Sequence, residues 1–224
     1  MPTLTLDHVT YTYGKNTKPA LDAVSCTFTS GTVYAVVGPS GSGKSTLLAM
    51  LSGLDRPTGG VIALDGASLA DLDLDKYRRE DATVIFQAFQ LFPLLTVLEN
   101  VCFPLELRGV SPAEAKPQAE ELLGRVGIAE ELWKRYPSHL SGGEQQRVAI
   151  ARSIASGAHI LLCDEPTGNL DTENTKIVMD LLCSLAHESG CCVIVVTHDP
   201  EVAASADRVF RLVDGVLRQE NGEE

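Results

Sequence analysis

The chain has 224 residues, a net charge of −12, and 44% hydrophobic and 21% charged residues. This length and composition are typical of one large α/β domain with a substantial core. Acidic residues gather at 71–81, 114–131 and 220–224, and their field repels polyanions. We therefore expect neither nucleic acid nor an anionic lipid surface as the principal ligand.

Targeting and redox features favour the cytoplasm. Residues 1–7 lack the basic and apolar regions of a signal peptide, and no apolar run approaches the roughly 20 residues that span a bilayer. The six cysteines show no metal-ligand spacing, so we expect reduced, mostly buried thiols. We expect a cytoplasmic protein, unless a partner carries it to a membrane.

The chain begins with predicted strands. Residues 3–13 alternate between apolar and polar and predict a half-exposed strand, 23–29 predict a second, and the apolar run 33–37 predicts a buried parallel strand. Tyr13 either offers its ring to a purine or only caps the sheet, and the spacing leaves both interpretations open.

A phosphate-binding loop follows, between that strand and a helix predicted over 45–51. Its glycines let backbone N–H groups point inward, and the helix adds the positive end of its dipole. We predict that Lys44 contacts the β- and γ-phosphates of a nucleoside triphosphate and that the Ser45 hydroxyl ligates Mg²⁺. The loop, which fits G-x-x-x-x-G-K-[ST], consists of Gly38, Pro39, Ser40, Gly41, Ser42, Gly43, Lys44, Ser45 and Thr46.

Another strand edge comes next. The sequence predicts a strand at 61–64, a short acidic helix or irregular connection at 69–79, and a buried strand at 83–86. Gln87 follows this last strand at its carboxyl end, the edge where open α/β sheets bind ligands. Its amide can reach Mg²⁺ or an attacking water there.

The middle of the chain is predicted to be helical. The apolar segment 88–95 is either a satellite core or a surface for a partner. Strand signals are absent from 96 to 136, and Ser111 with Glu114 forms a capping box. We expect Pro117 to kink or shorten the first turn of the helix that follows.

A second capping box, Ser141 with Glu144, begins a helix that continues to residue 155. The first turn of this helix contains Gly142 and Gly143, which lower helix stability. Such glycines make sense where another molecule must approach the backbone closely, and a helix start of this kind suits a phosphate.

The next strand, 160–165, ends in two carboxylates. Alternation along a strand predicts that Asp164 and Glu165 point to opposite sides, so one can hold Mg²⁺ while the other polarises a hydrolytic water. His198 follows the apolar strand 191–196 at the same edge of the sheet.

A predicted helix separates these two strands, and two short strands, 209–213 and 216–218, close the chain. We expect Thr172 to cap the helix and Gly190 to end it. Its apolar residues, which we expect to face inward, are Ile177, Val178, Leu181, Leu182 and Leu185.

These motifs together resemble the nucleotide-binding subunit of ATP-binding-cassette (ABC) transporters over essentially the whole chain. Leu140–Gln145 resembles the signature motif of that family, and Ile160–Glu165 resembles its Walker B strand with the catalytic glutamate. The resemblance implies a P-loop NTPase core with a mainly parallel sheet, an antiparallel β subdomain and an α-helical subdomain inserted at about 88–156. All of these would form one domain, 1–224.

Further positions resemble known functional residues of the family. Gln87 is similar to the Q-loop glutamine, His198 to the switch histidine, Asn169–Asp171 to the D-loop and Tyr13 to the aromatic residue that stacks on adenine. The resemblance implies ATP and Mg²⁺ as ligands. The implied Mg²⁺ ligands are Ser45, Gln87 and Asp164. The implied catalytic residues are Lys44, Gln87, Glu165 and His198.

The same resemblance implies a dimer, of two identical or paralogous subunits, around two ATP molecules. ATP would contact Tyr13 and the phosphate loop of one subunit, and Ser141 and Gly143 of the other would cover its γ-phosphate. Gly142 and Asp171 are further implied ATP-binding residues. The segment Phe89–Leu95 would receive an integral-membrane permease and hold the protein on the inner face of the membrane.

The sequences of two segments, 90–101 and 165–171, are similar to those of the family branch that serves macrolide and peptide export, lipoprotein release and cell division. This implies an ATPase that powers a separate permease, with export favoured. The alternative is an ATPase that regulates a non-transporting, permease-like partner, as in cell-division signalling.

Overall fold

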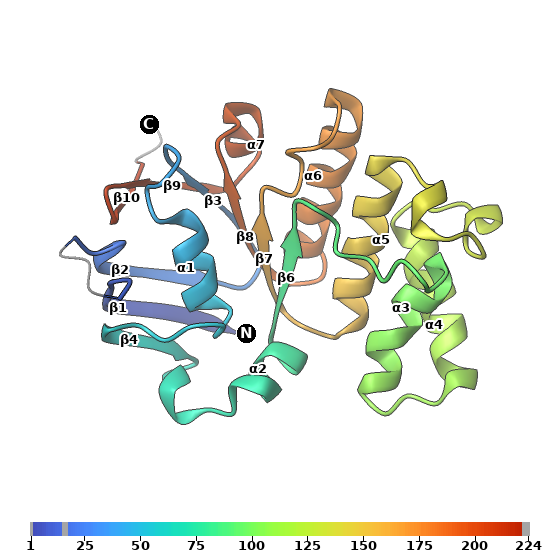
Figure 1. Ribbon diagram of the computed structural model, residues 1–224, viewed down its shortest axis with the longest axis horizontal. Coiled ribbons are helices and arrows are strands. Elements are labelled where there is room, and N and C mark those ends of the chain that lie inside the picture. The colour runs from blue at the N-terminus through green and yellow to red at the C-terminus, as the bar shows by residue number, and fades with distance from the viewer. Residues whose placement is uncertain (1, 15–17, 221–224) are drawn as a thin grey trace.

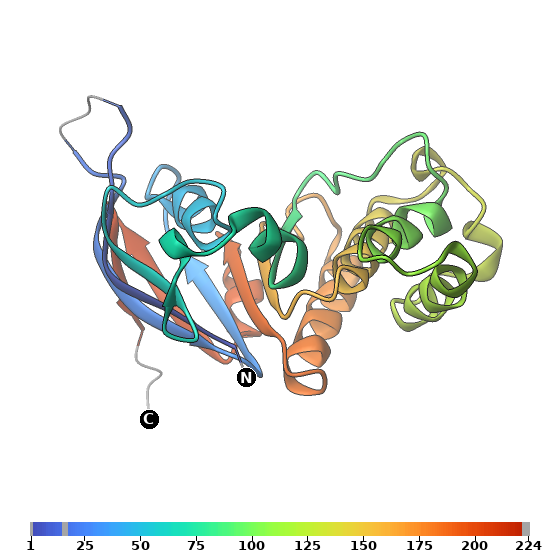
Figure 2. The same cartoon turned by 90° about the horizontal axis from the view of Figure 1, so that it is seen from below.

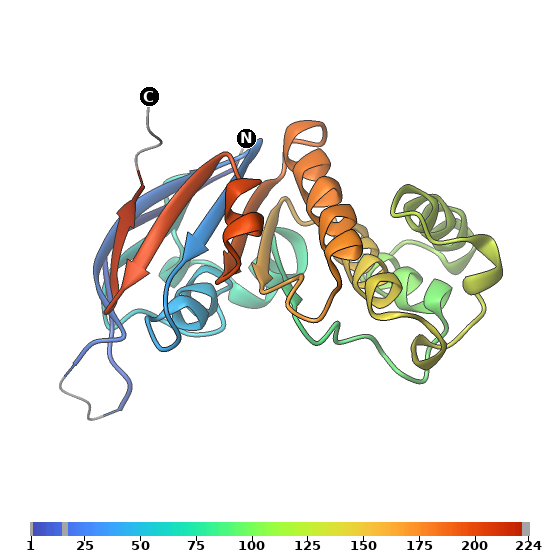
Figure 3. The same cartoon turned by 90° about the horizontal axis from the view of Figure 1, so that it is seen from above.

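The computed structural model describes residues 2–14 and 18–220 (Figure 1). Part of the acidic C-terminal stretch, 221–224, lies outside the described residues. Within the described ranges, no helix combines the length and the apolar character needed to cross a bilayer. Two sheets form one end of the molecule, and a group of helices projects from the other end (Figures 2 and 3).

The smaller sheet is antiparallel and four-stranded. In spatial order it contains β2 (Leu21–Thr29), β1 (Thr3–Tyr11), β4 (Gly59–Leu64) and β5 (Ala67–Ser68). The alternating pattern of β1 buries Leu4, Leu6 and Val9, and register shifts mark irregularities on both of its edges. These shifts re-aim the strand near its carboxyl end, where the site begins.

The larger sheet has six strands and is mainly parallel. In spatial order it contains β10 (Val216–Gln219), β9 (Arg208–Val213), β3 (Thr32–Val37), β8 (Cys192–Thr197), β7 (Ile160–Asp164) and β6 (Ala82–Phe86). Only the pair of β9 and β10 is antiparallel. The carboxyl ends of β3, β6, β7 and β8 therefore meet at one edge, as the sequence predicts for its candidate residues.

The helices divide into two groups. Those that lie against the sheets are α1 (Lys44–Leu51), α2 (Leu74–Glu80), α6 (Thr172–His187) and α7 (Pro200–Ala204). The others, which we call the helical arm, are α3 (Val97–Leu107), α4 (Pro112–Arg125) and α5 (Gly142–Ala155). Short 3₁₀ turns occupy Leu69–Asp71, Glu130–Leu132 and Pro137–His139.

The core consists of three apolar clusters. Strand β7 belongs to two of them, because its alternate side chains face opposite sides of the sheet. Ile160 and Leu162 join the cluster with α1 and the antiparallel sheet, whereas Leu161 and Cys163 join the cluster with α6. The helical arm has its own core, so it can form a unit beside the sheets. All six cysteines are free thiols, as predicted.

The predicted fold class is confirmed, with local corrections in the arm. Helix α4 runs from Pro112 through Pro117 without interruption, so its first turn is not shortened as expected. The carbonyl that loses its partner belongs to Ala113, which is exposed and can face water. Ser111 is the N-cap residue as predicted, but its hydroxyl donates to the Glu114 carboxylate (2.6 Å) and makes no bond to the helix backbone.

Helix α6 also differs from expectation. Its N-cap is Asp171, whose carboxylate accepts from the backbone N–H of Asn174, whereas Thr172 is the first helical residue. Ile177 is exposed, because the buried stripe begins one position later, at Val178. One residue turns a helix by about 100°, which is enough to move a side chain off the stripe.

Candidate active site

The phosphate loop lies between β3 and α1 and requires its glycines. Gly41 and Gly43 have φ values of +78° and +108°, in the left-handed region that favours glycine. A Cβ on Gly43 would lie 2.4 Å from the Ala20 carbonyl oxygen. Lys44 is buried, and its Nζ donates to the carbonyls of Gly38 (2.7 Å) and Pro39 (3.0 Å). The loop therefore holds the ammonium group of Lys44 against its own backbone carbonyls.

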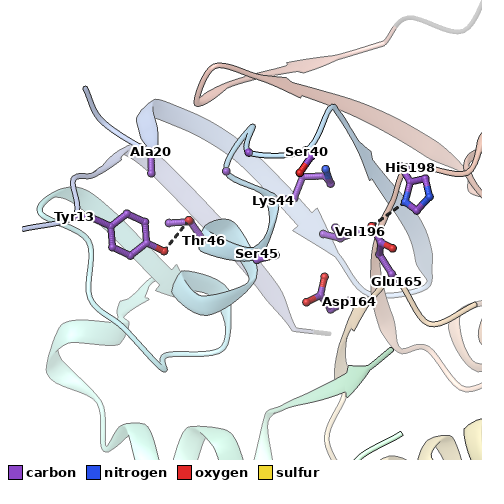
Figure 4. Close-up of a pocket in the computed structure, with 12 residues that line it drawn as sticks. Tyr13, Ala20, Ser40, Lys44, Ser45, Thr46, Asp164, Glu165, Val196 and His198 are labelled. Carbon is purple, nitrogen blue, oxygen red and sulfur yellow. Dashed lines mark hydrogen bonds and ion pairs between the residues drawn. The ribbon is translucent and has the colours of Figure 1, made fainter. Parts of the chain in front are cut away.

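Beside the loop is a cavity of about 470 Å³ (Figure 4). Most of the predicted site residues line this cavity together. These are Tyr13, Ser40, Gly41, Gly43, Lys44, Ser45, Thr46, Asp164, Glu165 and His198. Ala20 and Val196 complete the lining, and no motif in the sequence marked them.

The two carboxylates at the end of β7 do not obey strand alternation. The strand ends at Asp164, and Glu165 adopts a left-handed conformation with φ +46°. Both residues therefore line the same cavity, and the prediction that they face opposite sides is wrong. Burial, and secondly the charge of Glu165, raises the pKa of Asp164 above its ordinary value, while Lys44 opposes the shift.

Glu165 is oriented by His198. The Nδ1 of His198 lies 2.8 Å from Oε1 of Glu165, so an Nδ1–H can donate to the carboxylate. The Glu165 side chain is 24% exposed and that of His198 is 69% exposed. A carboxylate held at the cavity wall in this way is suited to accept a proton from water.

Tyr13 forms a side wall of the cavity. It follows β1, and its hydroxyl lies 3.0 Å from Oγ1 of Thr46. The ring packs edge-on against Tyr11, with 4.8 Å between the centroids. The Tyr11 hydroxyl in turn donates to Asp55, which raises the pKa of Tyr11 to about 12. Tyr13 thus has a fixed ring that is 49% exposed beside the phosphate loop.

Gln87 and Asp171 do not line this cavity. Gln87 pairs with Asn169: its Nε2 donates to Asn169 Oδ1 (3.3 Å), and Asn169 Nδ2 donates to the Gln87 carbonyl (3.1 Å). Asp171 caps α6. Of the phosphate-loop residues, Gly38, Pro39 and Ser42 also lie outside the cavity lining.

The start of α5 lies on the helical arm, outside the cavity lining (Figure 1). Ser141 is exposed and forms the predicted capping box with Glu144. A Cβ on Gly143 would lie 1.9 Å from Asn174 Oδ1, whereas one on Gly142 would find its nearest atoms at 3.6 Å. Packing within the same chain therefore accounts for the lack of a side chain at Gly143, whereas the approach of another molecule to the backbone of these two glycines stays a prediction.

The donor atoms in the cavity fit a magnesium ion. Ser45 supplies an exposed hydroxyl and Asp164 a half-buried carboxylate, the oxygen donors that Mg²⁺ prefers. A cation beside Asp164 would offset the burial and the Glu165 charge that raise its pKa. The described residues contain no cluster of three His, Cys, Asp or Glu side chains, so this would be a site with few protein ligands.

Comparison with known proteins agrees with this geometry. A family model for the ABC transporter matches residues 21–168. LolD, the ATP-binding protein of a lipoprotein-releasing system in Hahella chejuensis, is 44% identical over 213 residues, which cover 94% of this chain and 92% of LolD.

Solved structures are similar over almost the whole chain. The dimeric structure of MJ0796, a bacterial ABC transporter cassette, is 41% identical, covers 99% of both chains and has a TM-score of 0.89. A post-hydrolysis dimer of MJ0796 bound to ADP and Pi gives the same values. CbiO1 from Clostridium perfringens, part of the ABC transporter complex cbiONQ, is 30% identical, with a TM-score of 0.88 and coverage of 97% and 88%. The chain therefore belongs to the ABC transporter family, in which it is an ATP-binding and ATP-hydrolysing cassette.

Proposed function

We propose that two copies of this chain close around two ATP molecules, each held between the phosphate loop of one copy and the start of α5 in the other. One observation carries this proposal: Ser141 is exposed on the arm, and the cavity that contains Lys44 includes no residue of α5. A single copy therefore holds only part of the predicted site. The dimeric structures of MJ0796, one of them bound to ADP and Pi, support a dimer that holds nucleotide.

Phosphate binding rests on the loop and on Lys44. When ATP enters, Lys44 exchanges its bonds to the Gly38 and Pro39 carbonyls for the β- and γ-phosphates. Ser45 and Asp164 would hold Mg²⁺, which neutralises phosphate charge when bound. Tyr13 offers its ring to the adenine, and Ser141 of the second copy covers the γ-phosphate.

Hydrolysis rests on Glu165. Glu165 accepts a proton from a water whose oxygen attacks the γ-phosphorus, while the bond to the β–γ bridging oxygen breaks and ADP leaves. The loose transition state of this transfer needs positioning more than covalent help. His198 holds the Glu165 carboxylate in place and contacts the γ-phosphate. Gln87 must leave Asn169 before it can reach Mg²⁺ or the water.

The chain drives a separate membrane permease through Phe89–Leu95. Leu94 is 86% exposed and Phe92 is 41% exposed, while Leu91 packs on the core of the arm. The segment thus combines an anchored side with an apolar surface that a short permease helix can cover. The docked complex would lie on the inner face of the membrane. CbiO1 is part of an ABC transporter complex, and the similarity to LolD favours an exporter over a non-transporting partner.

The decisive experiment is Glu165→Gln. This change removes the proton acceptor but keeps the shape of the side chain, so we expect the ATPase rate to fall by at least about 100-fold. With Mg-ATP the variant should run as a dimer in size-exclusion chromatography with light scattering. Adding Ser141→Arg should return it to a monomer that still binds ATP. A Glu165→Gln protein that binds Mg-ATP but stays monomeric would refute the sandwich.

The permease itself is identified by purifying the chain from its native membranes in mild detergent. Reconstitution of the pair in liposomes then distinguishes the two classes of partner. An exporter moves a substrate in an ATP-dependent manner, whereas a signalling partner stimulates ATP hydrolysis without transport.

A further inference from the structure

Arg152 links α5 to the segment Phe89–Phe92. Its Nη1 donates to the carbonyl of Gln90 (2.5 Å) and its Nη2 to the carbonyl of Phe89 (3.3 Å). The guanidinium carbon also lies 5.6 Å from the centroid of the Phe92 ring. One side chain from the arm thus contacts three of the four residues between Phe89 and Phe92.

The backbone that Arg152 contacts is strained. Phe89 and Gln90 have φ values of +58° and +52°, which residues with a side chain rarely adopt. Such conformations persist where surrounding contacts hold them. Arg152 supplies such contacts, because its two donors bind the carbonyls of these two residues and fix their orientation.

The environment of Arg152 is unusual for a cation. Burial lowers the pKa of Arg152 from its ordinary value. Its recorded partners among the described residues are two backbone carbonyls and an aromatic ring, without a carboxylate. A guanidinium presents its donors in a fixed planar fork and a flat face to the ring, whereas a lysine ammonium is a compact point charge without that fixed geometry.

We propose that Arg152 is a positioning residue that transmits movement of α5 to the segment Phe89–Phe92. This inference rests on the proposed function, in which the Ser141 end of α5 engages ATP and Phe89–Leu95, which includes Phe89–Phe92, docks the permease. Ser141 and Arg152 lie about 16 Å apart along one rigid helix, at 1.5 Å per residue. A shift of the start of α5 on ATP binding therefore also moves Arg152. Through its contacts with Phe89–Phe92, Arg152 then moves that segment.

Hydrogen–deuterium exchange of the whole chain tests this coupling. In a Glu165→Gln parent, Mg-ATP should change amide exchange at 88–95 as well as in the phosphate loop. Adding Arg152→Lys should leave the ATP-dependent dimer intact, speed exchange at 88–95 by about tenfold, and abolish its response to ATP. The matched control is Arg108→Lys, because Arg108 also donates to a backbone carbonyl of the arm, that of Ala155, but has no hydrogen bond to 88–95 among the described residues. The control should behave like the parent.

Several outcomes separate this inference from the proposed function. A parent that stays monomeric in Mg-ATP refutes the proposed function, and the inference falls with it. A parent that dimerises without any change at 88–95, or an Arg152→Lys protein with the parent's response, refutes the inference alone. If Arg152→Lys does not fold, Phe92→Leu removes the ring beneath the guanidinium and should weaken the ATP response at 88–95. A full response in that variant also refutes the coupling.

Discussion

Replacing Gly143 with alanine tests whether this glycine is required by packing inside one chain. The new Cβ would lie 1.9 Å from Oδ1, 2.3 Å from Cγ and 3.0 Å from Cβ of Asn174. Rotation of the Asn174 side chain would relieve the two shortest contacts, but its Cβ would still have to move by a few tenths of an ångström. Asn174 also bonds to Asp171 and Arg147, and those contacts would be disturbed.

The expected loss follows from two opposing effects. Overpacking costs about 1–3 kcal/mol in general, and contacts as short as 1.9 and 2.3 Å place this change at about 2–3 kcal/mol. Alanine in place of glycine returns up to about 1 kcal/mol of helix propensity. We therefore expect Gly143→Ala to lower the free energy of unfolding by about 1–2 kcal/mol, which corresponds to a Tm decrease of roughly 2–8 °C for a chain of this size.

Gly142→Ala is the matched control. The nearest atoms to its new Cβ, on Leu170 and Phe89, are 3.6 Å away, which is ordinary contact, so we expect the same or slightly greater stability. Urea unfolding followed by circular dichroism measures both variants. Combining Gly143→Ala with Asn174→Ala should recover part of the loss. A Gly143→Ala protein whose urea midpoint equals or exceeds that of the wild type would refute the reasoning.

Two further predictions concern the edge of the sheet and its opposite end. His198→Ala removes the bond that orients Glu165, so kcat should fall by about 100-fold while ATP affinity stays within about threefold. Steady-state ATPase assays measure kcat and ATP titration measures the affinity. An unchanged kcat would contradict this prediction. Burial alone would raise the pKa of Asp207, but the Val33 N–H (2.7 Å) and His187 bring it below its ordinary value. A lowered folded-state pKa stabilises the protein above the ordinary value of 3.8, and this stability is lost as the pH falls through the folded-state pKa. Asp207→Asn should therefore lower Tm near pH 7, and the difference in Tm between wild type and variant should shrink below about pH 4. A difference in Tm that grows on acidification would contradict this assignment.

The sequence by itself determined the functional motifs that are continuous along the chain. The phosphate loop and the Ser141 capping box depend on residues a few positions apart, so local spacing specifies both their structure and their chemistry. The carboxyl ends of the parallel strands could also be predicted to meet at one edge. This is why the sequence predicts one site for Asp164, Glu165 and His198.

The tertiary structure alone decided how distant segments contact one another. The pairing of Gln87 with Asn169 joins residues 82 positions apart, and the bond from Arg152 to Gln90 joins residues 62 apart. Likewise, only the packing of α6 against α5 shows that Asn174 leaves no room for a side chain at position 143. Such contacts depend on how helices and sheets pack, and no local spacing or periodicity encodes them. The left-handed conformation of Glu165 is of the same kind, because the surrounding fold holds a residue where its own preference would not.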